Sequence, residues 1–562
     1  MKRILLKLLK YGIITIFSMI FLLLTVGVVL YFSADRKIPE VNIPEPIPLV
    51  IQYDGYTQFD SSVLRLNRPG LWELHLKGDA TERGLAFGQL CKSLMYEQEK
   101  AFVDQIRKLV PSGHYLNFLK YLTIIYNRNI ARNIPEEFRK EIYTSSLACS
   151  SEFDFIGSAY DRQLNYHAAH DLGHAMQEYM LVGCSSFGVW GSLTRDSSLI
   201  IGRNFDFYVG DDFAKNKIVS FYYPDKGYRF ASVGWAGMVG VLSGMNETGL
   251  TVTINAAKSA PPTSSKTPIS IIAREILQYS SNIEEAFKIA QKLDAFVSES
   301  ILIGSANDGI AAIIEKTPKS TILFTVEGDM IISTNHFQSP EFLSNIKNLD
   351  IIKKLNAGHS QYRFNRINEL ITEKEPITPL KAAEILRNPY GIGKKLIGWT
   401  NEKSVNQFIS HHAVIFEPNK RLMWVSTNPW QLSEMVAYDL DSIFNRKSFS
   451  SKLNIETLSI PEDSLMMRKV YGNVMKFKEL VLKISDAVKN KKLLSENELD
   501  TLLKCNPDFF YTYMLLGNYY ESVGEINKSI AMYEESIKKE IPSFEAKLEI
   551  SEKLTQLTRK KN

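Results

Sequence analysis

The sequence predicts an α+β protein in which two β-sheets pack face to face and helices cover them from outside. Three observations indicate this fold class. Residues 80–183 have the apolar spacing of helices, whereas short apolar runs bounded by Gly, Asp and Asn follow from residue 184 and are typical of strands. Helical spacing returns at 269–279 and 283–293, and further strand-like runs come after it. Because helices and strands come in blocks, we do not expect strands and helices to alternate along the main domain.

The composition is that of a globular protein with two or three domains. The chain has 562 residues, of which 45% are hydrophobic and 23% are charged, and its net charge is +4. No basic block lies outside the chain ends, so nucleic acid is not an expected partner. The four cysteines, Cys91, Cys149, Cys184 and Cys505, lack the spacing of a zinc ribbon or a redox motif, and they do not indicate a disulfide framework.

Residues 1–37 have the features of a membrane anchor. Residues 11–32 contain no charged residue and are long enough to cross a bilayer as a helix. Four basic residues precede this run, which favours an N-terminus inside the cell and a main domain on the outer side, periplasmic or extracellular. A cleaved signal peptide is the alternative. The apolar run is longer than in most signal peptides, and a poor cleavage site follows it, so we expect an uncleaved, single-pass anchor.

Four further regions follow the anchor. Residues 38–74 begin with several prolines and are predicted to be an extended tether. Residues 75–183 are predicted to be a helical segment, and residues 184–455 the main domain. Residues 456–562 are again helical, and part of them fits a tetratricopeptide unit. The residues that fit it are Leu516, Gly517, Tyr520, Gly524, Tyr533 and Pro542. A plain helical hairpin is the alternative, since one repeat cannot bury its own faces, and a protein partner for these helices stays open.

Cys184 is the strongest candidate nucleophile. It stands where the helix-like sequence gives way to strands, and the first two strands are predicted to form a hairpin. Such a hairpin would return Arg203 and Asp206 to the side of Cys184. An adjacent arginine lowers the pKa of a thiol, and a carboxylate can orient a base or hold an ammonium group. Cys149 lies in a Ser- and Asp-rich stretch that lacks a comparable set of partners.

Several short stretches, in a fixed order, resemble a known enzyme family. Gly183-Cys184 is followed by GRNFDF, then by GMNETGLTVTIN, and then by STNH. This order resembles the acyl-coenzyme A:6-aminopenicillanic acid acyltransferase family of N-terminal-nucleophile hydrolases and, more distantly, the choloylglycine hydrolases. The resemblance covers about residues 75–430 and includes the early stretch ERGLAFGQL. It implies a four-layer αββα sandwich.

The resemblance also implies that the chain cuts itself between Gly183 and Cys184. Cys184 would then become an N-terminal residue that is both the nucleophile and, through its α-amine, the base. Residues 75–183 would belong to the α chain, and residues 184–455 would be the core of the β chain. The catalytic residues that the resemblance implies are Cys184, Arg203, Asp206, Asn255, Asn335 and Arg363, with Arg366 as the other register for the last.

Among these residues, the resemblance assigns Asp206 to binding the α-amine and to assisting the cleavage. Asn255 is an oxyanion donor and Asn335 a second active-site asparagine. The expected function is a self-processing cysteine hydrolase or acyltransferase that forms an acyl-enzyme on Cys184. Its substrates would be small molecules with a linear amide (C–N) bond or an acyl thioester, and no cofactor is expected. An inactive binding or scaffold protein that uses the C-terminal helices is an alternative.

A histidine-rich stretch offers a competing site. His167, His170, Asp171 and His174 have the spacing of one helix face, which would suit a divalent metal ion in a metal-dependent hydrolase. The stretch lacks the glutamate of the HExxH zinc motif. We therefore expect a polar helix face without a metal ion.

Overall fold

The computed structural model describes most of the chain in seven stretches. They are residues 2–110, 112–168, 181–257, 265–344, 358–446, 449 and 451–561.

The larger of two β-sheets has eleven strands among the described residues, and its outermost four come from the N-terminal part of the chain. The order is β1-β2-β3-β4-β8-β9-β10-β11-β12-β13-β14. The bounds are β1 (Ile51–Tyr53), β2 (Tyr56–Phe59), β3 (Ser62–Arg68), β4 (Leu71–Gly78), β8 (Lys217–Pro224), β9 (Phe230–Gly234), β10 (Ser243–Asn246), β11 (Leu250–Ala256), β12 (Glu299–Ser305), β13 (Ile310–Lys316) and β14 (Thr321–Phe324). β4 and β8 pair in parallel, and the other neighbours are antiparallel.

The smaller sheet packs face to face on the larger one. Its order is β15-β6-β7-β16-β17-β18, and β5 pairs with β7 beside this path. The bounds are β5 (Leu181–Val182), β6 (Ser185–Gly191), β7 (Ser197–Tyr208), β15 (Met330–Ser333), β16 (Ser410–Glu417), β17 (Leu422–Ser426) and β18 (Met435–Asp439). Buried residues of both sheets meet in one cluster, in which Val219 and Phe221 of the larger sheet lie with Ile201 and Val414 of the smaller. Burial of this apolar surface holds the two sheets together.

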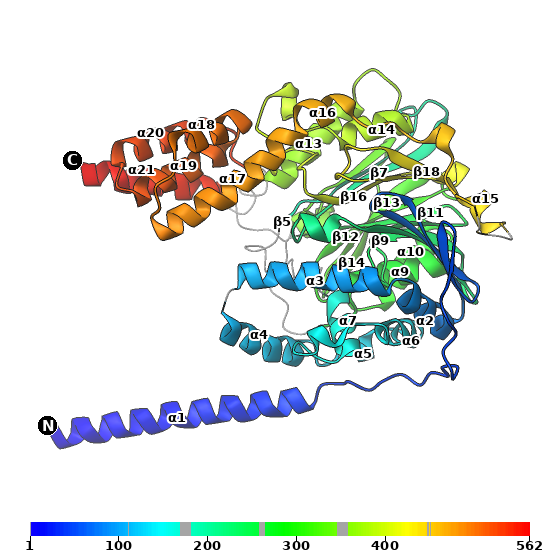
Figure 1. Ribbon diagram of the computed structural model, residues 1–562, viewed down its shortest axis with the longest axis horizontal. Coiled ribbons are helices and arrows are strands. Elements are labelled where there is room, and N and C mark those ends of the chain that lie inside the picture. Colours follow the sequence, from blue (N-terminus) through cyan, green and yellow to red (C-terminus); the bar gives the residue numbers. More distant parts are fainter. Residues whose placement is uncertain are drawn as a thin grey trace.

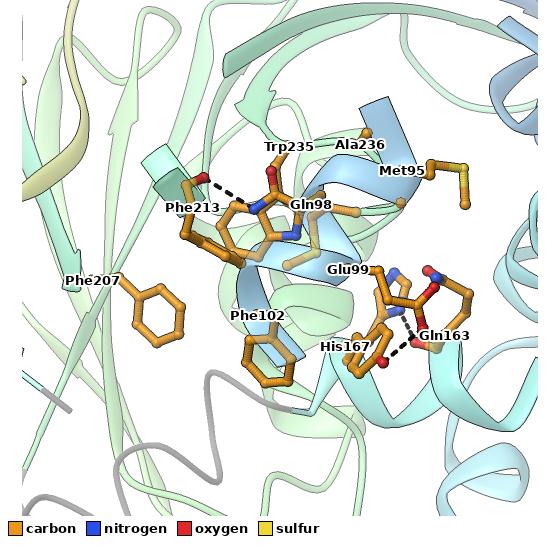
Figure 2. A pocket seen from close by; sticks show the side chains of 13 residues that line it. Met95, Gln98, Glu99, Phe102, Gln163, His167, Phe207, Phe213, Trp235 and Ala236 are labelled. Carbon is orange, nitrogen blue, oxygen red and sulfur yellow. Dashed lines mark hydrogen bonds between the residues drawn. The ribbon is translucent and has the colours of Figure 1, made fainter. Parts of the chain in front are cut away.

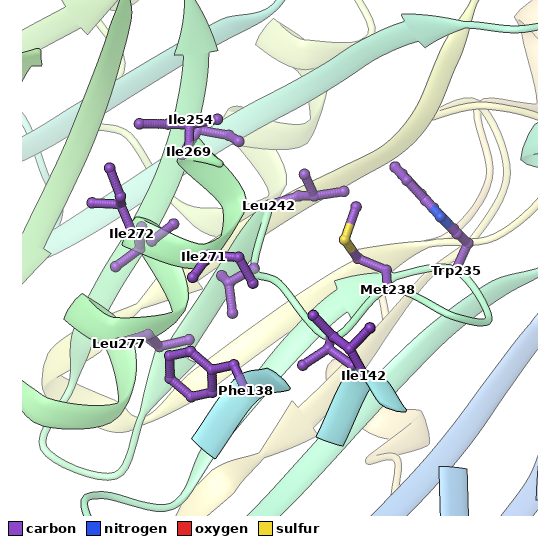
Figure 3. Close-up of a cluster of buried hydrophobic side chains, with 14 of the residues drawn as sticks. Phe138, Ile142, Trp235, Met238, Leu242, Ile254, Ile269, Ile271, Ile272 and Leu277 are labelled. Atoms are coloured by element: carbon purple, nitrogen blue, oxygen red, sulfur yellow. The ribbon is translucent and has the colours of Figure 1, made fainter. Parts of the chain in front are cut away.

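Helices cover the outer face of each sheet, which completes four layers (Figure 1). On the larger sheet these are α2 (Ala80–Leu90), α6 (Glu136–Ser146), α9 (Ile269–Tyr279) and α10 (Ile283–Lys292). On the smaller sheet they are α13 (His359–Ile371) and α14 (Pro379–Leu386). Figure 3 shows Phe138 and Ile142 of α6 and several isoleucines of α9 in the outer cluster of the larger sheet. The αββα arrangement that the sequence predicts is therefore confirmed.

The sequence explains the helices that flank the core. In α9 the buried residues include Ile269, Ile272, Ala273 and Ile276, a spacing that places them on one face. The next helix, α10, begins after Asn282, whose side chain accepts a hydrogen bond from the N–H of Glu285. Both helices lie where the sequence predicts them, and α10 ends one residue earlier.

The tether expected at 38–74 is shorter in the structure. Residues 38–50 contain the prolines and form no helix or strand, but β1 begins at Ile51. Leu71 of β4 lies between the two sheets, whereas Leu74 and Leu76 face the helices. β4 therefore buries apolar residues on both of its faces, as a strand covered on both sides does. In an extended tether the same residues would be exposed to water.

The remaining helices lie toward the two ends of the chain. The N-terminal helix α1 (Lys2–Phe32) contains a stretch, Leu8–Phe32, that is long and apolar enough to cross a membrane. Before β5 come α3 (Lys92–Leu109), α4 (Gly113–Tyr126), α5 (Ile130–Asn133) and α7 (Ala159–His167); α11 (Pro340–Ser344) and α15 (Leu440–Phe444) are short. The C-terminal helices are α16 (Ser464–Lys469), α17 (Tyr471–Asn490), α18 (Glu496–Cys505), α19 (Phe510–Ser522), α20 (Ile526–Ile537) and α21 (Phe544–Lys561).

The C-terminal residues are helical, as predicted, and project from one end of the sandwich (Figure 1). Tyr533 of α20 packs so closely on Gly517 of α19 that a Cβ atom there would lie 3.0 Å from its ring. Ser529 and Ser536 of α20 donate hydrogen bonds to carbonyl oxygens of α19, at 2.8 and 2.9 Å. These contacts explain a close α19–α20 pair. The tetratricopeptide character of the pair stays a prediction.

Candidate active site

Cys184 lies directly before β6, and the predicted hairpin of β6 and β7 returns Arg203 to its side. The register pairs Ser186 with Arg203. Cys184 is fully buried, and its Sγ atom lies 3.9 Å from Nη2 of Arg203. Burial raises the pKa of the Cys184 thiol to about 11, while the charge of Arg203 acts in the opposite direction. The thiol is therefore protonated at neutral pH, and a base is needed to activate it.

Arg203 is held rigidly between the two sheets. Its guanidinium donates hydrogen bonds to the carbonyl oxygen of Leu242, at 3.1 Å, and to that of Ile254. It also donates to Oγ of Ser243, which pairs with Nε2 of His412 at 2.9 Å. These contacts fix the position of the positive charge beside the sulfur atom, so no rearrangement is needed to place it there.

Asp206 lies three residues further along β7 and holds the peptide segment that precedes Cys184. Its backbone oxygen accepts a hydrogen bond from the N–H of Gly183 at 3.1 Å. Its carboxylate accepts hydrogen bonds from Oγ of Ser410 and from Nε2 of Gln407, the latter at 3.3 Å. Burial raises the pKa of Asp206 to about 7, although the hydrogen bond from Ser410 lowers it. A carboxyl group with this pKa can take up a proton at neutral pH.

The carbonyl oxygen of Gly183 accepts two hydrogen bonds from side chains. Nη1 of Arg363 donates to it at 2.6 Å, and Nε2 of Gln407 donates at 2.8 Å. Nη1 of Arg363 also donates to the carbonyl oxygen of Cys184 at 2.6 Å. A Cβ atom on residue 183 would clash with the amide of Gln407, which gives a physical reason for glycine at this position. The peptide bond between Gly183 and Cys184 thus has donors at the oxygen that would become negative under nucleophilic attack.

The two asparagines bind residues that neighbour or contact this peptide bond. Oδ1 of Asn335 accepts a hydrogen bond from Nη2 of Arg363 at 2.7 Å. Asn255, on β11, accepts one from Oγ of Ser186 at 3.0 Å and donates one from Nδ2 to the carbonyl oxygen of Ser333 at 2.9 Å. An amide nitrogen carries two N–H groups, so Asn255 has a second donor beyond the one that binds Ser333.

The structure brings all the sequence-predicted catalytic residues into one cluster. Of the two alternative arginines, Arg363 contacts Gly183 and Cys184. Arg366 instead donates a hydrogen bond to Glu369 at 2.7 Å. Sequence reasoning missed Gln407 and Ser410. Gln407 lies at the end of the irregular segment between α14 and β16, Ser410 is the first residue of β16, and no motif around them carries a signal.

A pocket lies next to this cluster, lined by α3, α7, the end of β7 and residues 235–238 (Figure 2). Its volume is about 490 Å³, including space open to solvent. The lining residues are Met95, Gln98, Glu99, Phe102, Gln163, Tyr166, His167, Phe207, Phe213, Trp235, Ala236, Gly237 and Met238.

Aromatic rings connect this pocket to the candidate nucleophile. The guanidinium of Arg203 lies 4.3 Å from the ring centre of Phe205. Phe205 in turn stacks on Phe207 at 5.7 Å, and Phe207 stacks on Trp235 at 6.1 Å. Phe207 and Trp235 line the pocket, so stacked rings link its wall to the charge that lies beside Cys184.

His167, one of the candidate metal ligands, is a buried structural histidine. Its Nδ1 atom lies 2.7 Å from the carbonyl oxygen of Gln163, and its Nε2 atom accepts a hydrogen bond from the N–H of Val239 at 3.0 Å. Burial lowers its pKa to about 4, so the ring is neutral at pH 7. Both ring nitrogens are engaged and neither is left for a metal ion. His170, Asp171 and His174 lie outside the described residues.

Comparison with known proteins adds an independent observation. Residues 193–429 match the family model described as acyl-coenzyme A:6-aminopenicillanic acid acyl-transferase. The resemblance noted from the sequence is thereby confirmed. The matched residues include Arg203, Asp206, Asn255, Asn335 and Arg363, and they begin after Cys184.

Curated relatives match part of the chain. An uncharacterized protein of Archaeoglobus fulgidus is 26% identical over 241 residues, which are 40% of this chain and 39% of that protein. Protein dcd1B of Dictyostelium discoideum is 23% identical over 256 residues, 43% of this chain and 49% of that protein. The chain thus spans less than half the length of these two relatives.

Solved structures also resemble the chain. The N-acylethanolamine-hydrolyzing acid amidase ortholog of Caenorhabditis elegans has a TM-score of 0.32 and 15% identity, covering 42% of this chain and 93% of that one. A mutant of the conjugated bile acid hydrolase from Clostridium perfringens has a TM-score of 0.33 and 13% identity, covering 49% of this chain and 96% of that one. Penicillin V acylase from Agrobacterium tumefaciens has a TM-score of 0.31 and 15% identity, covering 46% of this chain and 86% of that one.

Proposed function

We propose that this chain, of which residues 193–429 match the acyltransferase family of N-terminal-nucleophile hydrolases, is a self-processing cysteine hydrolase or acyltransferase. The family supports an enzyme of amide hydrolysis or acyl transfer. The nucleophile in this proposal is Cys184, which lies outside the matched residues. The observation that carries the proposal is the geometry of the Gly183–Cys184 peptide bond, whose carbonyl oxygen accepts hydrogen bonds from Arg363 and Gln407.

Self-cleavage would use the thiol of Cys184 on the carbonyl carbon of Gly183. Asp206, with its pKa raised to about 7, would take the thiol proton. The oxyanion would be stabilised by Arg363 and Gln407, and each such donor is worth roughly 10²–10³ in rate. Collapse of the intermediate breaks the C–N bond, passes a proton to the nitrogen of Cys184 and leaves a Gly183 thioester. Water then hydrolyses the thioester, which frees the thiol and the α-amine of Cys184.

The same residues would then act on a substrate. The α-amine of Cys184 would replace Asp206 as the base, and Asp206 would bind the resulting ammonium group. The thiolate would attack the substrate carbonyl carbon while Asn255 donates to its oxygen. The amine or thiol of the substrate leaves with a proton, and the acyl group stays on sulfur. Water releases it as an acid, or a second amine accepts it.

The adjacent pocket indicates the kind of acyl group. Phe102, Phe207, Phe213 and Trp235 supply apolar walls, and Met95 and Met238 supply flexible apolar side chains. A small-molecule amide or thioester with an apolar acyl group fits this lining. The amine or thiol part of the substrate would lie on the other side of Cys184.

The terminal regions have separate proposed roles. We propose that α1 anchors the enzyme in a membrane with the sandwich on the outer side, which is supported by its length and apolar composition. The C-terminal helices pack on the segment that carries Gln407. Nζ of Lys478 donates to the carbonyl oxygen of Phe408 at 3.2 Å, and the N–H of Trp399 donates to Oδ1 of Asn506 at 2.9 Å. Their role would be to position this segment, and a protein partner on their outer face is a further candidate role.

The test is to purify the full chain and analyse it on a denaturing gel with N-terminal sequencing. The proposal predicts two fragments, 1–183 and 184–562, the second beginning Cys-Ser-Ser-Phe. Cys184→Ala should leave one chain, and Cys149→Ala, a matched cysteine change, should still give two. An intact wild-type chain would contradict self-cleavage and favour an inactive binding protein. Loss of cleavage or activity with a metal chelator would instead favour the metal-dependent hydrolase.

A further inference from the structure

Helix α4 presents an apolar face that the described part of the chain leaves about half exposed. Tyr115, Phe118, Tyr121 and Leu122, which we call the α4 face, are between 44% and 55% exposed. Their spacing places them along one side of the helix. No residue of α4 is buried, although most helices of the molecule bury a stripe of side chains. Packing within the described part of the chain therefore leaves this aromatic face half in solvent.

The α4 face lies next to the end of the apolar helix α1. The two helices pack against each other, and the ring of Tyr31 in α1 lies 5.7 Å from that of Tyr121 in α4 (Figure 1). The link that follows α1 is also bound to residues just after α4. The N–H of Asp35 donates to the carbonyl oxygen of Arg128 at 2.7 Å, and the carboxylate of Asp35 pairs with Arg132 at 2.9 Å.

The stretch of sequence that contains α4 carries basic residues and no acidic ones. Residues 105–135 contain no Asp or Glu and carry Arg107, Lys108, Lys120, Arg128 and Arg132. This excess of basic residues stands out in a chain that is close to neutral. Basic residues beside exposed aromatic and aliphatic side chains are the composition of helices that lie in a membrane interface, where the basic groups reach anionic lipid headgroups. A protein partner would need a matching acidic rim, whereas an anionic membrane supplies the charge directly.

We propose that the α4 face is a membrane-docking surface that inserts into the same lipid leaflet that the end of α1 enters. α1 would place α4 at the bilayer, and α4 would fix the orientation of the sandwich above it. This inference rests on the proposed membrane location of α1, and it is independent of the chemistry at Cys184. It also places α3, which lines the pocket and precedes α4 in the chain, close to the lipid surface.

The test measures contact of single tryptophans with lipid in the full chain. Phe118→Trp, Phe17→Trp and Leu482→Trp are made separately and reconstituted in vesicles of phosphatidylcholine and phosphatidylglycerol in equal amounts, with or without bromine on the acyl chains. Leu482 lies on α17 and is 75% exposed, which makes it a matched surface control. The fluorescence of the added tryptophan is obtained by subtracting the wild type. Bromine quenches tryptophan only on contact.

We expect at least twofold quenching for Phe118→Trp and Phe17→Trp, and none for Leu482→Trp. Leu122→Trp, a second position on the α4 face, should match Phe118→Trp. Quenching at position 17 without quenching at 118 and 122 would leave the anchor intact and overturn the docking of α4. Equal quenching at 118 and 482 would also overturn it. Shielding of 118 from an aqueous quencher without bromine contact would show that a second copy of the chain covers the α4 face.

Discussion

Glu141 of α6 accepts a hydrogen bond from Nη2 of Arg274 of α9 at 3.3 Å, and both side chains are fully buried. The same carboxylate pairs with Arg83 of α2 at 3.2 Å. Glu141 and Arg83 precede the proposed cleavage bond, whereas Arg274 follows it. An ion pair therefore joins the two proposed fragments inside the core.

We predict that Glu141→Ala destabilises the protein by about 3–5 kcal/mol, because it removes the buried carboxylate that pairs with Arg274, while Arg83 keeps its pair with Glu137. The measurement is the free energy of unfolding in denaturant, made in the uncut Cys184→Ala chain. Glu136→Ala, on the same helix but on an exposed pair with Lys140, should cost less than about 1 kcal/mol. Equal effects of the two changes would contradict the role of Glu141.

Gln407→Leu should slow self-cleavage by roughly 10²–10³, because it removes one donor to the Gly183 oxygen while keeping the side-chain size. The rate is followed on denaturing gels after synthesis of the chain. Gln431→Leu is the control, since that buried glutamine donates to Leu386 at 3.3 Å and does not touch Gly183. Unchanged cleavage in Gln407→Leu would show that Arg363 alone stabilises the oxyanion.

Self-cleavage should become faster as the pH rises through about 7. Burial raises the pKa of Asp206 to about 7, so below that pH the carboxyl group is protonated and cannot accept the thiol proton. The rate should fall about tenfold for each pH unit below 7 and level off above it. Asp206→Asn should be slow at every pH. A wild-type rate that is flat from pH 5 to 8 would rule out Asp206 as the base.

Met238→Trp should fill the pocket and exclude long acyl groups while short ones still react. We expect the ratio of kcat/KM for an octanoyl amide to that for an acetyl amide to fall at least tenfold, because bulk is added to a closely lined space. Met330→Trp makes the same change on β15, away from the pocket. If both variants alter the ratio equally, the acyl group binds elsewhere.

His167→Gln should destabilise the protein at pH 7, and the loss should shrink as the pH falls. The folded pKa of His167 is about 4, below its ordinary 6.5, so between these values the unfolded chain binds a proton that the folded chain does not. Between pH 6.5 and 4, the unfolding free energy of the wild type therefore falls by up to about 1.4 kcal/mol per pH unit through this residue. The variant lacks this pH-dependent loss, because glutamine does not titrate. A pH-independent difference in unfolding free energy would contradict a neutral, buried His167.

The sequence carried enough signal for the fold and for most of the site. Strand-like runs after Cys184 and a short polar motif on β7 were sufficient to predict that Arg203 returns to the thiol, because a hairpin is a local structure. Gln407 lies 224 residues from Gly183 in an irregular segment. Its contact depends on how α14 and β16 pack, and neither periodicity nor spacing reports such packing.

The N-terminal strands were missed for a different reason. The prolines up to residue 48 led to the prediction of a tether over the whole segment, although the apolar residues of β3 and β4 have the pattern of strands. Pairing of β4 with β8 joins residues more than a hundred positions apart, and a segment with apolar residues on both faces can be recognised only once both covering layers are known.

The parallel pairing of β4 with β8, from Leu71–Lys217 to Gly78–Pro224, has a consequence for the fate of the cut protein. If the short fragment left with β1–β4, β8 would become the edge strand of the larger sheet, with unpaired N–H and C=O groups along its length. Such an edge recruits strands of other molecules and leads to aggregation. In a chain cut as proposed, the short fragment would therefore have to stay bound to keep the long fragment from aggregating.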